Sequence, residues 1–135
     1  MAVSTAIRML VRERSGMRCE YCRMKEAWEP YFIYHVEHII ALQYKGDDSP
    51  DNLALACNHC NLIKGPNLSS IDPDTNEVTR LFHPRVQDWA DHFHLTGGRI
   101  AGLTPVGRTT VFLLEMNALH RIELRQENFA GWCAA

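Results

Sequence analysis

HVEHII at residues 35–40 and CNHCNLIK at residues 57–64 lie close together in the most informative part of this chain. DNL at residues 51–53 stands between them, and a second cysteine pair, CEYC at residues 19–22, stands just ahead. The segment therefore gathers thiols, imidazoles, a carboxylate and amides, which are side chains that bind metal ions in proteins. Two kinds of site are expected here, one built from thiols and one built from oxygen and nitrogen groups.

The cysteines predict a structural zinc site. They form two Cys-x-x-Cys pairs, Cys19 with Cys22 and Cys57 with Cys60. Two residues between paired cysteines allow a tight turn to point both sulfurs at one ion, and four thiolates fill the tetrahedral shell of zinc without leaving a position for substrate. Two redox motifs are the alternative, but no βαβ pattern surrounds either pair. His59, inside the second pair, is an alternative ligand, and Cys133 is expected to be a free thiol.

More residues separate the two pairs than a simple zinc ribbon needs, which indicates an inserted functional segment. Glu37 and His38 lie in this insert, and Asn61 follows the last cysteine of the pairs. Hydrolysis of a phosphodiester needs a base for water and a cation for the charge that develops on the phosphate. Histidine suits the base role, and carboxylate or amide oxygens suit a hard cation. Neighbouring residues of a strand point to opposite sides, so a bend is required, and by spacing alone such a histidine is more often part of a packed core.

The residue types, order and intervals of this segment resemble the HNH endonuclease family over about residues 5–68. The matching positions are Glu37-His38-Ile39-Ile40, Asn52-Leu53, Cys60-Asn61 and Lys64. The resemblance implies an α+β fold built on a ββα-metal finger, with two strands, a loop and a helix around one catalytic cation. The expected fold adds the structural zinc knuckle pair, a flanking N-terminal helix and a mostly helical C-terminal extension.

Carried over by position, the resemblance implies a role for each matching residue. His38 is similar to the general base of the family, and Glu37 to its acidic metal ligand. Asn61 corresponds to the second protein ligand, and Asn52 to the middle asparagine that pins the loop and orients the base. Lys64 falls where many members keep a basic residue near the phosphate.

Two departures from the family pattern bear on the catalytic metal. The third motif residue is Asn61 instead of histidine, and an amide oxygen favours Mg²⁺ or Mn²⁺ over zinc at the catalytic site. His35 occupies a position that is often acidic in the family. It is a tentative third ligand, and the alternatives are that it accepts a hydrogen bond from bound water or packs against its neighbours.

The charge balance restricts where a nucleic acid could bind. Fourteen basic and sixteen acidic residues give a net charge of −2, whereas a non-specific DNA binder is usually basic over a whole face. A nucleic-acid surface must therefore be local. Arginines crowd the N-terminal part, and the tentative contacts are Arg12, Arg18 and Arg23, together with Lys64. A solvated helix face is the alternative interpretation of these arginines.

Capping and hydrophobic spacing predict the local structure before the second cysteine pair. Ser4 is expected to cap a helix with Ile7, Leu10 and Val11 on one stripe, ended by Gly16. Residues 31–40 suit strands, and residues 45–50 form a loop. Asp51 or Asn52 is expected to cap a short helix over residues 53–56.

The second half carries less chemistry. Pro84 is expected to start a helix with Val86, Trp89, Ala90 and Phe93 on one side, followed by an extended piece over residues 99–103. Thr104 and Pro105 predict the start of a helix, and the apolar residues Val111 to Leu114, Met116 and Leu119 predict a buried helix. Asn117 is expected to cap a last helix. This half is similar to the tail of certain small bacterial stand-alone HNH proteins.

These observations predict an HNH core over residues 1–70 and an extension over residues 71–135 packed on it, as one compact domain. The expected function is metal-dependent cleavage of DNA, by nicking or on both strands. A non-catalytic zinc module that binds DNA or protein, or an RNase, is the alternative. Without an apparent signal peptide or membrane span, the chain is expected to be a cytoplasmic bacterial protein with no membrane partner. A monomer and a homodimer both remain open.

Overall fold

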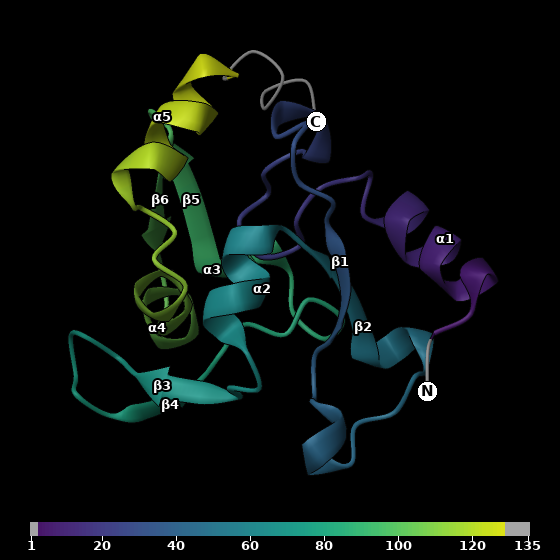
Figure 1. The fold of residues 1–135 in the computed structure, drawn as a ribbon. Helices are drawn as coiled ribbons and strands as arrows, with labels where there is room; N and C mark the ends of the chain where they lie inside the picture. The colour runs from purple at the N-terminus through teal and green to yellow at the C-terminus, as the bar shows by residue number, and fades with distance from the viewer. Residues whose placement is uncertain (1–2, 129–135) are drawn as a thin grey trace. The chain divides into compact units, whose positions relative to one another are not determined.

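The computed structural model describes residues 3–128 (Figure 1), so Cys133 lies outside the described part. Backbone contacts divide the chain into two compact units. The N-terminal unit holds the residues up to Leu68 together with His83–Val86, and the C-terminal unit holds Ser69–Phe82 and the residues from Gln87 onward. No helix within residues 3–128 combines the length and apolar character needed to cross a membrane.

The centre of the N-terminal unit is a strand–strand–helix finger. Strand β1 (His35–His38) pairs antiparallel with β2 (Leu53–Ala56), with Glu37 opposite Ala54. Helix α2 (Asn58–Lys64) follows directly and packs against β1. Every side chain of β2 is buried, so this strand lies in the core of the unit. The order of elements confirms the predicted α+β class and its ββα finger.

The helix predicted over residues 53–56 is wrong. Leucine and alanine favour helices, but all four residues are buried and pair with β1, and such packing overrides a weak local preference. Asp51 and Asn52 lie instead in a short 3₁₀ turn, η3 (Pro50–Asn52), immediately before the strand.

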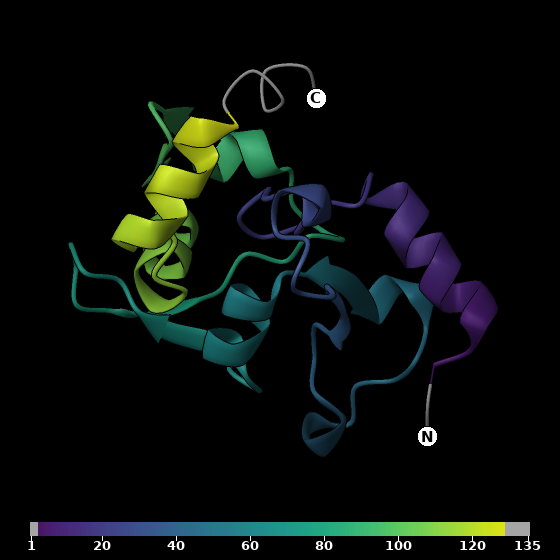
Figure 2. The same cartoon turned by 45° about the horizontal axis from the view of Figure 1, so that its top comes forward.

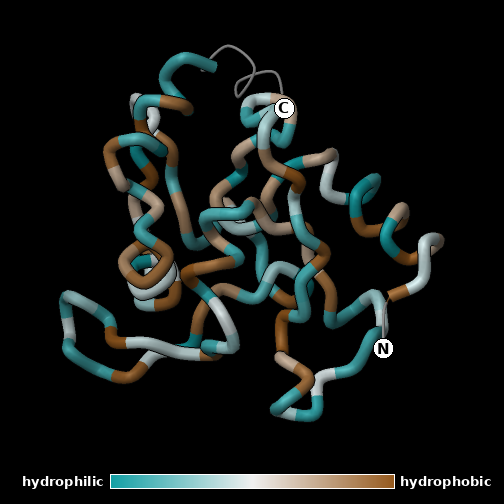
Figure 3. Tube along the Cα trace, in the orientation of Figure 1, coloured by the Kyte–Doolittle hydropathy of each residue, from teal (hydrophilic) through white to brown (hydrophobic). Residues whose placement is uncertain are grey.

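Helix α1 (Thr5–Arg14) begins as predicted, because the Ser4 hydroxyl accepts a hydrogen bond from the backbone N–H of Ile7 at 3.2 Å. Hydrophilic and hydrophobic positions alternate along it (Figure 3), and Val11 is fully buried while Leu10 stays largely exposed. Arg14 fixes the helix to the finger, since Nη2 donates to the carbonyl oxygens of Pro50 and Leu53, each at 2.7 Å.

The C-terminal unit combines helices with two hairpins (Figures 1 and 2). Its elements are β3 (Ser69–Ile71), β4 (Val78–Arg80), α3 (Trp89–His92), β5 (Phe93–Thr96), β6 (Arg99–Gly102), α4 (Pro105–Leu113) and α5 (Leu119–Glu127). Strand β3 pairs with β4 and β5 with β6, both antiparallel, and α4 packs against β6 and the β3–β4 hairpin. Arg108 of α4 holds that hairpin through Asp72, with Nη2 donating to Oδ2 at 2.8 Å.

The start of α4 is as predicted, because Thr104 Oγ1 accepts from the backbone N–H of Gly107 at 3.0 Å. Its predicted burial is confirmed for Leu114 and Met116 but not along the whole apolar run. The helix ends at Leu113, and although Leu114 is fully buried, Phe112 and Leu119 are exposed. A run of apolar residues does not by itself show which of them face the core.

Two further predictions in this half are wrong. The helix expected from Pro84 is only the single turn α3, because Arg85 is held by an ion pair with Glu20 and Phe93 already belongs to β5. Asn117 does not cap α5. Its amide instead forms hydrogen bonds with the backbone N–H and C=O of Ile100, at 2.8 and 2.7 Å.

Candidate metal centre and adjoining cleft

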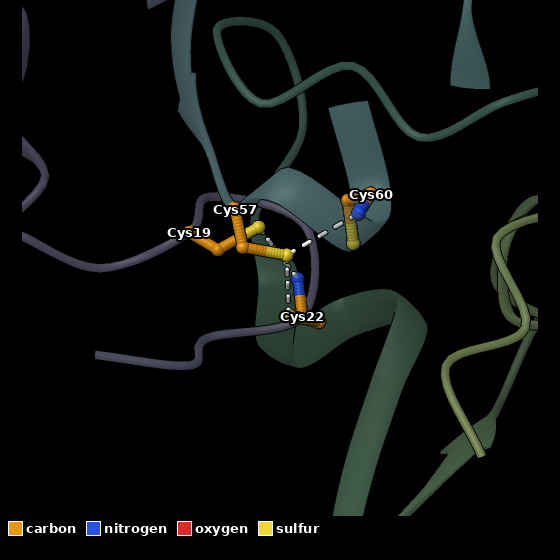
Figure 4. Close-up of side chains that lie close together, drawn as sticks. All are labelled: Cys19, Cys22, Cys57 and Cys60. Atoms are coloured by element: carbon orange, nitrogen blue, oxygen red, sulfur yellow. Dashed lines mark hydrogen bonds between the residues drawn. The ribbon is translucent and has the colours of Figure 1, made fainter. Parts of the chain in front are cut away.

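The four paired cysteines converge on one point (Figure 4). Cys19 and Cys22 lie on the loop after α1, Cys57 is the residue that caps α2, and Cys60 stands in the first turn of that helix. Their sulfur atoms lie within 4.8 Å of one another, and Cys22 Sγ is 3.7 Å from Cys57 Sγ. Metal–sulfur bonds of about 2.3 Å place the corners of a tetrahedron about 3.8 Å apart, whereas a disulfide is about 2.05 Å long. The buried cluster therefore fits a zinc knuckle, as predicted, and His59 is not part of it.

Local hydrogen bonds prepare these sulfurs to bind a cation. The backbone N–H of Cys22 donates to Cys19 Sγ at 3.5 Å, and that of Cys60 donates to Cys57 Sγ at 3.3 Å. Hydrogen bonding with Cys19 and Cys22 raises the pKa of the Cys57 thiol, as it does for Cys60. Four thiolates at this spacing repel one another in a buried site, so a divalent cation is what allows them to ionise together.

The two residues between Cys19 and Cys22 connect this cluster to the finger. Glu20 Oε2 accepts from the backbone N–H of Leu55 at 2.8 Å, and Glu20 also forms an ion pair with Arg85. Tyr21 is fully buried, and its hydroxyl donates to Oε1 of Glu37. The turn between Cys19 and Cys22 therefore binds both strand β2, through Leu55, and the carboxylate of Glu37 on β1.

Glu37 forms a buried ion pair with Lys64. Lys64 Nζ lies 3.3 Å from Glu37 Oε2 and donates to the carbonyl oxygen of Ile39 at 3.1 Å, while Glu37 is 8% and Lys64 2% exposed. Burial raises the pKa of Glu37, and Lys64 and the Tyr21 hydroxyl act in the opposite direction. In this structure the Lys64 ammonium is turned inward and stabilises the buried carboxylate, and its phosphate contact stays a prediction.

Lys64→Met is expected to lower the free energy of unfolding by about 3–5 kcal/mol, since it leaves the Glu37 carboxylate buried without its cation. Urea unfolding of the zinc-loaded protein measures the change. Lys45→Met removes an exposed lysine from the loop after β1 and should alter stability by less than about 0.5 kcal/mol. Equal, small effects of both substitutions would contradict the importance of the ion pair.

His38, at the end of β1, contacts a carboxylate that the sequence did not single out. Its Nε2 lies 2.6 Å from Oδ1 of Asp48, and both side chains are partly buried. Asp48 is one of three acidic residues in the loop sequence DDSPD, and no spacing rule distinguishes it from Asp47 or Asp51. Tyr21 was missed for a similar reason, because a residue between two cysteines carries no signal of its partner.

Asn52 anchors the loop that carries Asp48. Its Oδ1 accepts from the backbone N–H of Ile40 at 2.9 Å, and its Nδ2 donates to the carbonyl oxygens of Ile40 and Asp47 at 3.0 and 2.9 Å. A methyl group at Gly46 would overlap the Ile40 carbonyl oxygen and come within 2.9 Å of Asn52 Nδ2. Only glycine therefore allows the chain to pass so close to this anchor.

A cleft of about 470 Å³ opens at the end of β1 beside α2. It is lined by His35, Val36, Glu37, His38, Ala41, Leu42, Gln43, Asn61, Gly65 and Pro66. Within residues 3–128 no hydrogen bond engages the side-chain amide of Asn61, whereas His35 Nε2 lies 3.3 Å from Asn58 Oδ1. A carboxylate, an available amide and an imidazole thus face one cleft, which is a donor set suited to a cation that prefers oxygen ligands.

The N-terminal arginines have partners within the unit, and their contacts with a nucleic acid stay a prediction. Arg12 forms an ion pair with Glu26, and Arg18 is buried with its guanidinium 5.8 Å from the ring centre of Trp28. Arg23 lies beside the cysteine cluster, where burial lowers its pKa and the charges of Cys19 and Cys22 act against that change. Of these three residues, Arg23 is the one whose charge interacts with the cysteines.

The model of the HNH endonuclease family matches residues 19–67. No curated protein and no solved structure matches the chain. The matched range contains both cysteine pairs, the strands and helix of the finger, and every residue that lines the cleft. The match to the HNH endonuclease family therefore covers residues 19–67, which include the four cysteines of the metal site and the whole cleft.

Proposed function

We propose that this protein is a metal-dependent endonuclease that hydrolyses phosphodiester bonds of DNA, with His38 as the general base. The observation that supports this most strongly is that His38, Glu37 and Asn61 line the same cleft. His38 uses Nε2 for its contact with Asp48, and Nδ1 has no partner among the described residues. A purely structural zinc module has no need of an imidazole nitrogen held in this way.

In the proposed reaction His38 Nδ1 accepts a proton from water as the water oxygen attacks phosphorus. The bond between phosphorus and the 3′-oxygen breaks, and the departing oxygen takes up a proton, which leaves 5′-phosphate and 3′-hydroxyl ends. Glu37 and Asn61, with His35 as a tentative third ligand, would hold Mg²⁺ or Mn²⁺. That cation would stabilise the charge on the phosphate and the leaving oxygen.

Structural Zn²⁺ at the four cysteines completes the proposal. The zinc would hold the first knuckle against α2, and through Tyr21 it would fix the position of Glu37. In this scheme the thiolate site takes no part in the chemistry, because its four ligands leave no open position for water or phosphate.

Supercoiled plasmid incubated with the protein tests this function. Conversion to open circles or linear DNA is expected with Mg²⁺ or Mn²⁺ and not with EDTA, and linear product would indicate cleavage of both strands. Brief exposure to EDTA followed by excess Mg²⁺, without added zinc, should restore cleavage, because thiolates retain zinc better than oxygen ligands retain Mg²⁺.

Full activity in EDTA would contradict the assigned cation. Failure of the zinc-loaded protein to cleave plasmid with either metal would contradict the DNase function. A parallel assay on single-stranded RNA then decides between an RNase and a non-catalytic module.

A further inference from the structure

We propose that Asp48 is a positioning residue for His38, holding its imidazole in the tautomer that has a proton on Nε2 and a lone pair on Nδ1. The expected effect on the cleavage rate rests on the proposed nuclease function, whereas the assignment of the tautomer does not. Asp48 belongs to no motif in the sequence. We assign it to the site because its Oδ1 lies 2.6 Å from His38 Nε2.

The chemistry of the two groups determines the direction of the hydrogen bond. An ionised carboxylate can only accept, so Nε2 must be the donor. A neutral imidazole carries one N–H, which leaves Nδ1 as the acceptor. Because the side chains of His38 and Asp48 are only 20% and 34% exposed, water competes with this contact less than at an open surface.

The loop supplies Asp48 in a fixed position. Asn52 binds the carbonyl oxygen of Asp47, immediately before Asp48, and both backbone polar groups of Ile40, two residues after His38. On the other side of Asp48, Ser49 donates from its backbone N–H and its hydroxyl to Asp47 Oδ1, at 3.1 and 2.7 Å. The base and its carboxylate partner are therefore held by the same asparagine before any substrate binds.

This arrangement acts twice during the reaction. Before proton transfer, the hydrogen bond fixes the ring and disfavours the tautomer with a proton on Nδ1, which could not accept a proton from water at that nitrogen. After transfer, the Asp48 carboxylate lies next to the imidazolium and stabilises its charge. Asn52 thus orients the base indirectly, by placing Asp48, and not by contact with the imidazole.

Asp48→Asn tests the inference with Asp51→Asn as the matched control. Both substitutions remove one negative charge from the same loop, and Asp51 is exposed. Asp48→Asn is expected to lower kcat by about 10- to 100-fold with little change in KM, as is typical for residues that orient a functional histidine. An asparagine can also turn its NH₂ group toward Nε2, so ¹⁵N NMR of neutral His38 should change from one tautomer to a mixture.

Asp51→Asn should match the wild type in kcat and in the His38 spectrum, and Asp48→Glu should recover part of the rate. The inference is overturned if Asp48→Asn and Asp51→Asn behave alike, if only KM changes, or if the loss follows reduced zinc content or thermal stability. Should the wild type cleave no nucleic acid, the nuclease proposal fails, and the NMR comparison still decides whether Asp48 sets the tautomer.

Discussion

His38→Ala is expected to lower the rate of DNA cleavage by about 10²- to 10⁴-fold, the contribution usually made by a general base. The loss should appear in single-turnover rates on supercoiled plasmid, because it affects the chemical step. Zinc content, measured by atomic emission, should stay at the wild-type value, since His38 belongs to the cleft and not to the cysteine cluster. The substitution removes one polar contact, that with Asp48, and leaves the pairing of β1 with β2 intact.

His94→Ala is the matched control, because His94 is an exposed histidine on β5 of the C-terminal unit. This variant should cleave at the wild-type rate. Imidazole added to His38→Ala should restore part of the lost rate, while the same concentration should leave His94→Ala unaffected. A wild-type rate for His38→Ala would exclude it as the base.

The parts of the site that could be predicted from the sequence are those set by local spacing. Two residues between cysteines are enough to place two sulfurs in one turn, so the pairs Cys19–Cys22 and Cys57–Cys60 indicate their own geometry. The order of Glu37, His38 and Asn61 similarly led to a family whose finger brings them to one cleft. In each case the information lies in a few neighbouring residues.

The parts that could not be predicted depend on partners far away in the sequence. Leu53–Ala56 has the composition of a helix and becomes a strand because β1 is available to pair with it. Lys64 has the charge of a phosphate ligand and becomes an internal cation because Glu37 is buried opposite it. The charge of a side chain follows from its residue type, but its burial and its partner depend on the fold.

The same reasoning explains why Asp48 was missed although its neighbours were recognised. Asn52 fits the family pattern, but the pattern does not indicate which residue of the loop contacts His38. The close passage of Gly46 beside Ile40, together with the hydrogen bonds of Asn52 to Ile40 and Asp47, fixes the path of the loop that brings Asp48 to the imidazole. A turn-rich sequence indicates a loop without defining its path.

Removal of zinc is expected to unfold the N-terminal unit. Zinc bound by structural thiolate sites contributes about 10–16 kcal/mol in zinc-finger peptides, whereas whole domains are stable by about 5–15 kcal/mol. The cluster joins the first cysteine pair to the finger, because Cys57 caps α2 and Glu20 and Tyr21 bind Leu55 and Glu37. Cys57→Ser should have a similar effect, since it removes one ligand from a complete shell.

Hydrogen exchange of the full chain, with and without a zinc-selective chelator, measures this effect for each unit. The backbone N–H of Leu55, bonded to Glu20, should lose its protection, while that of Ile100, bonded to Asn117, should keep it. Cys133→Ser is the control and should bind zinc and resist exchange as the wild type does. Because Tyr21 holds Glu37, cleavage should disappear with zinc and should not return when Mg²⁺ alone is added. Wild-type protection of Leu55 in Cys57→Ser would show that the N-terminal unit folds without its thiolate site.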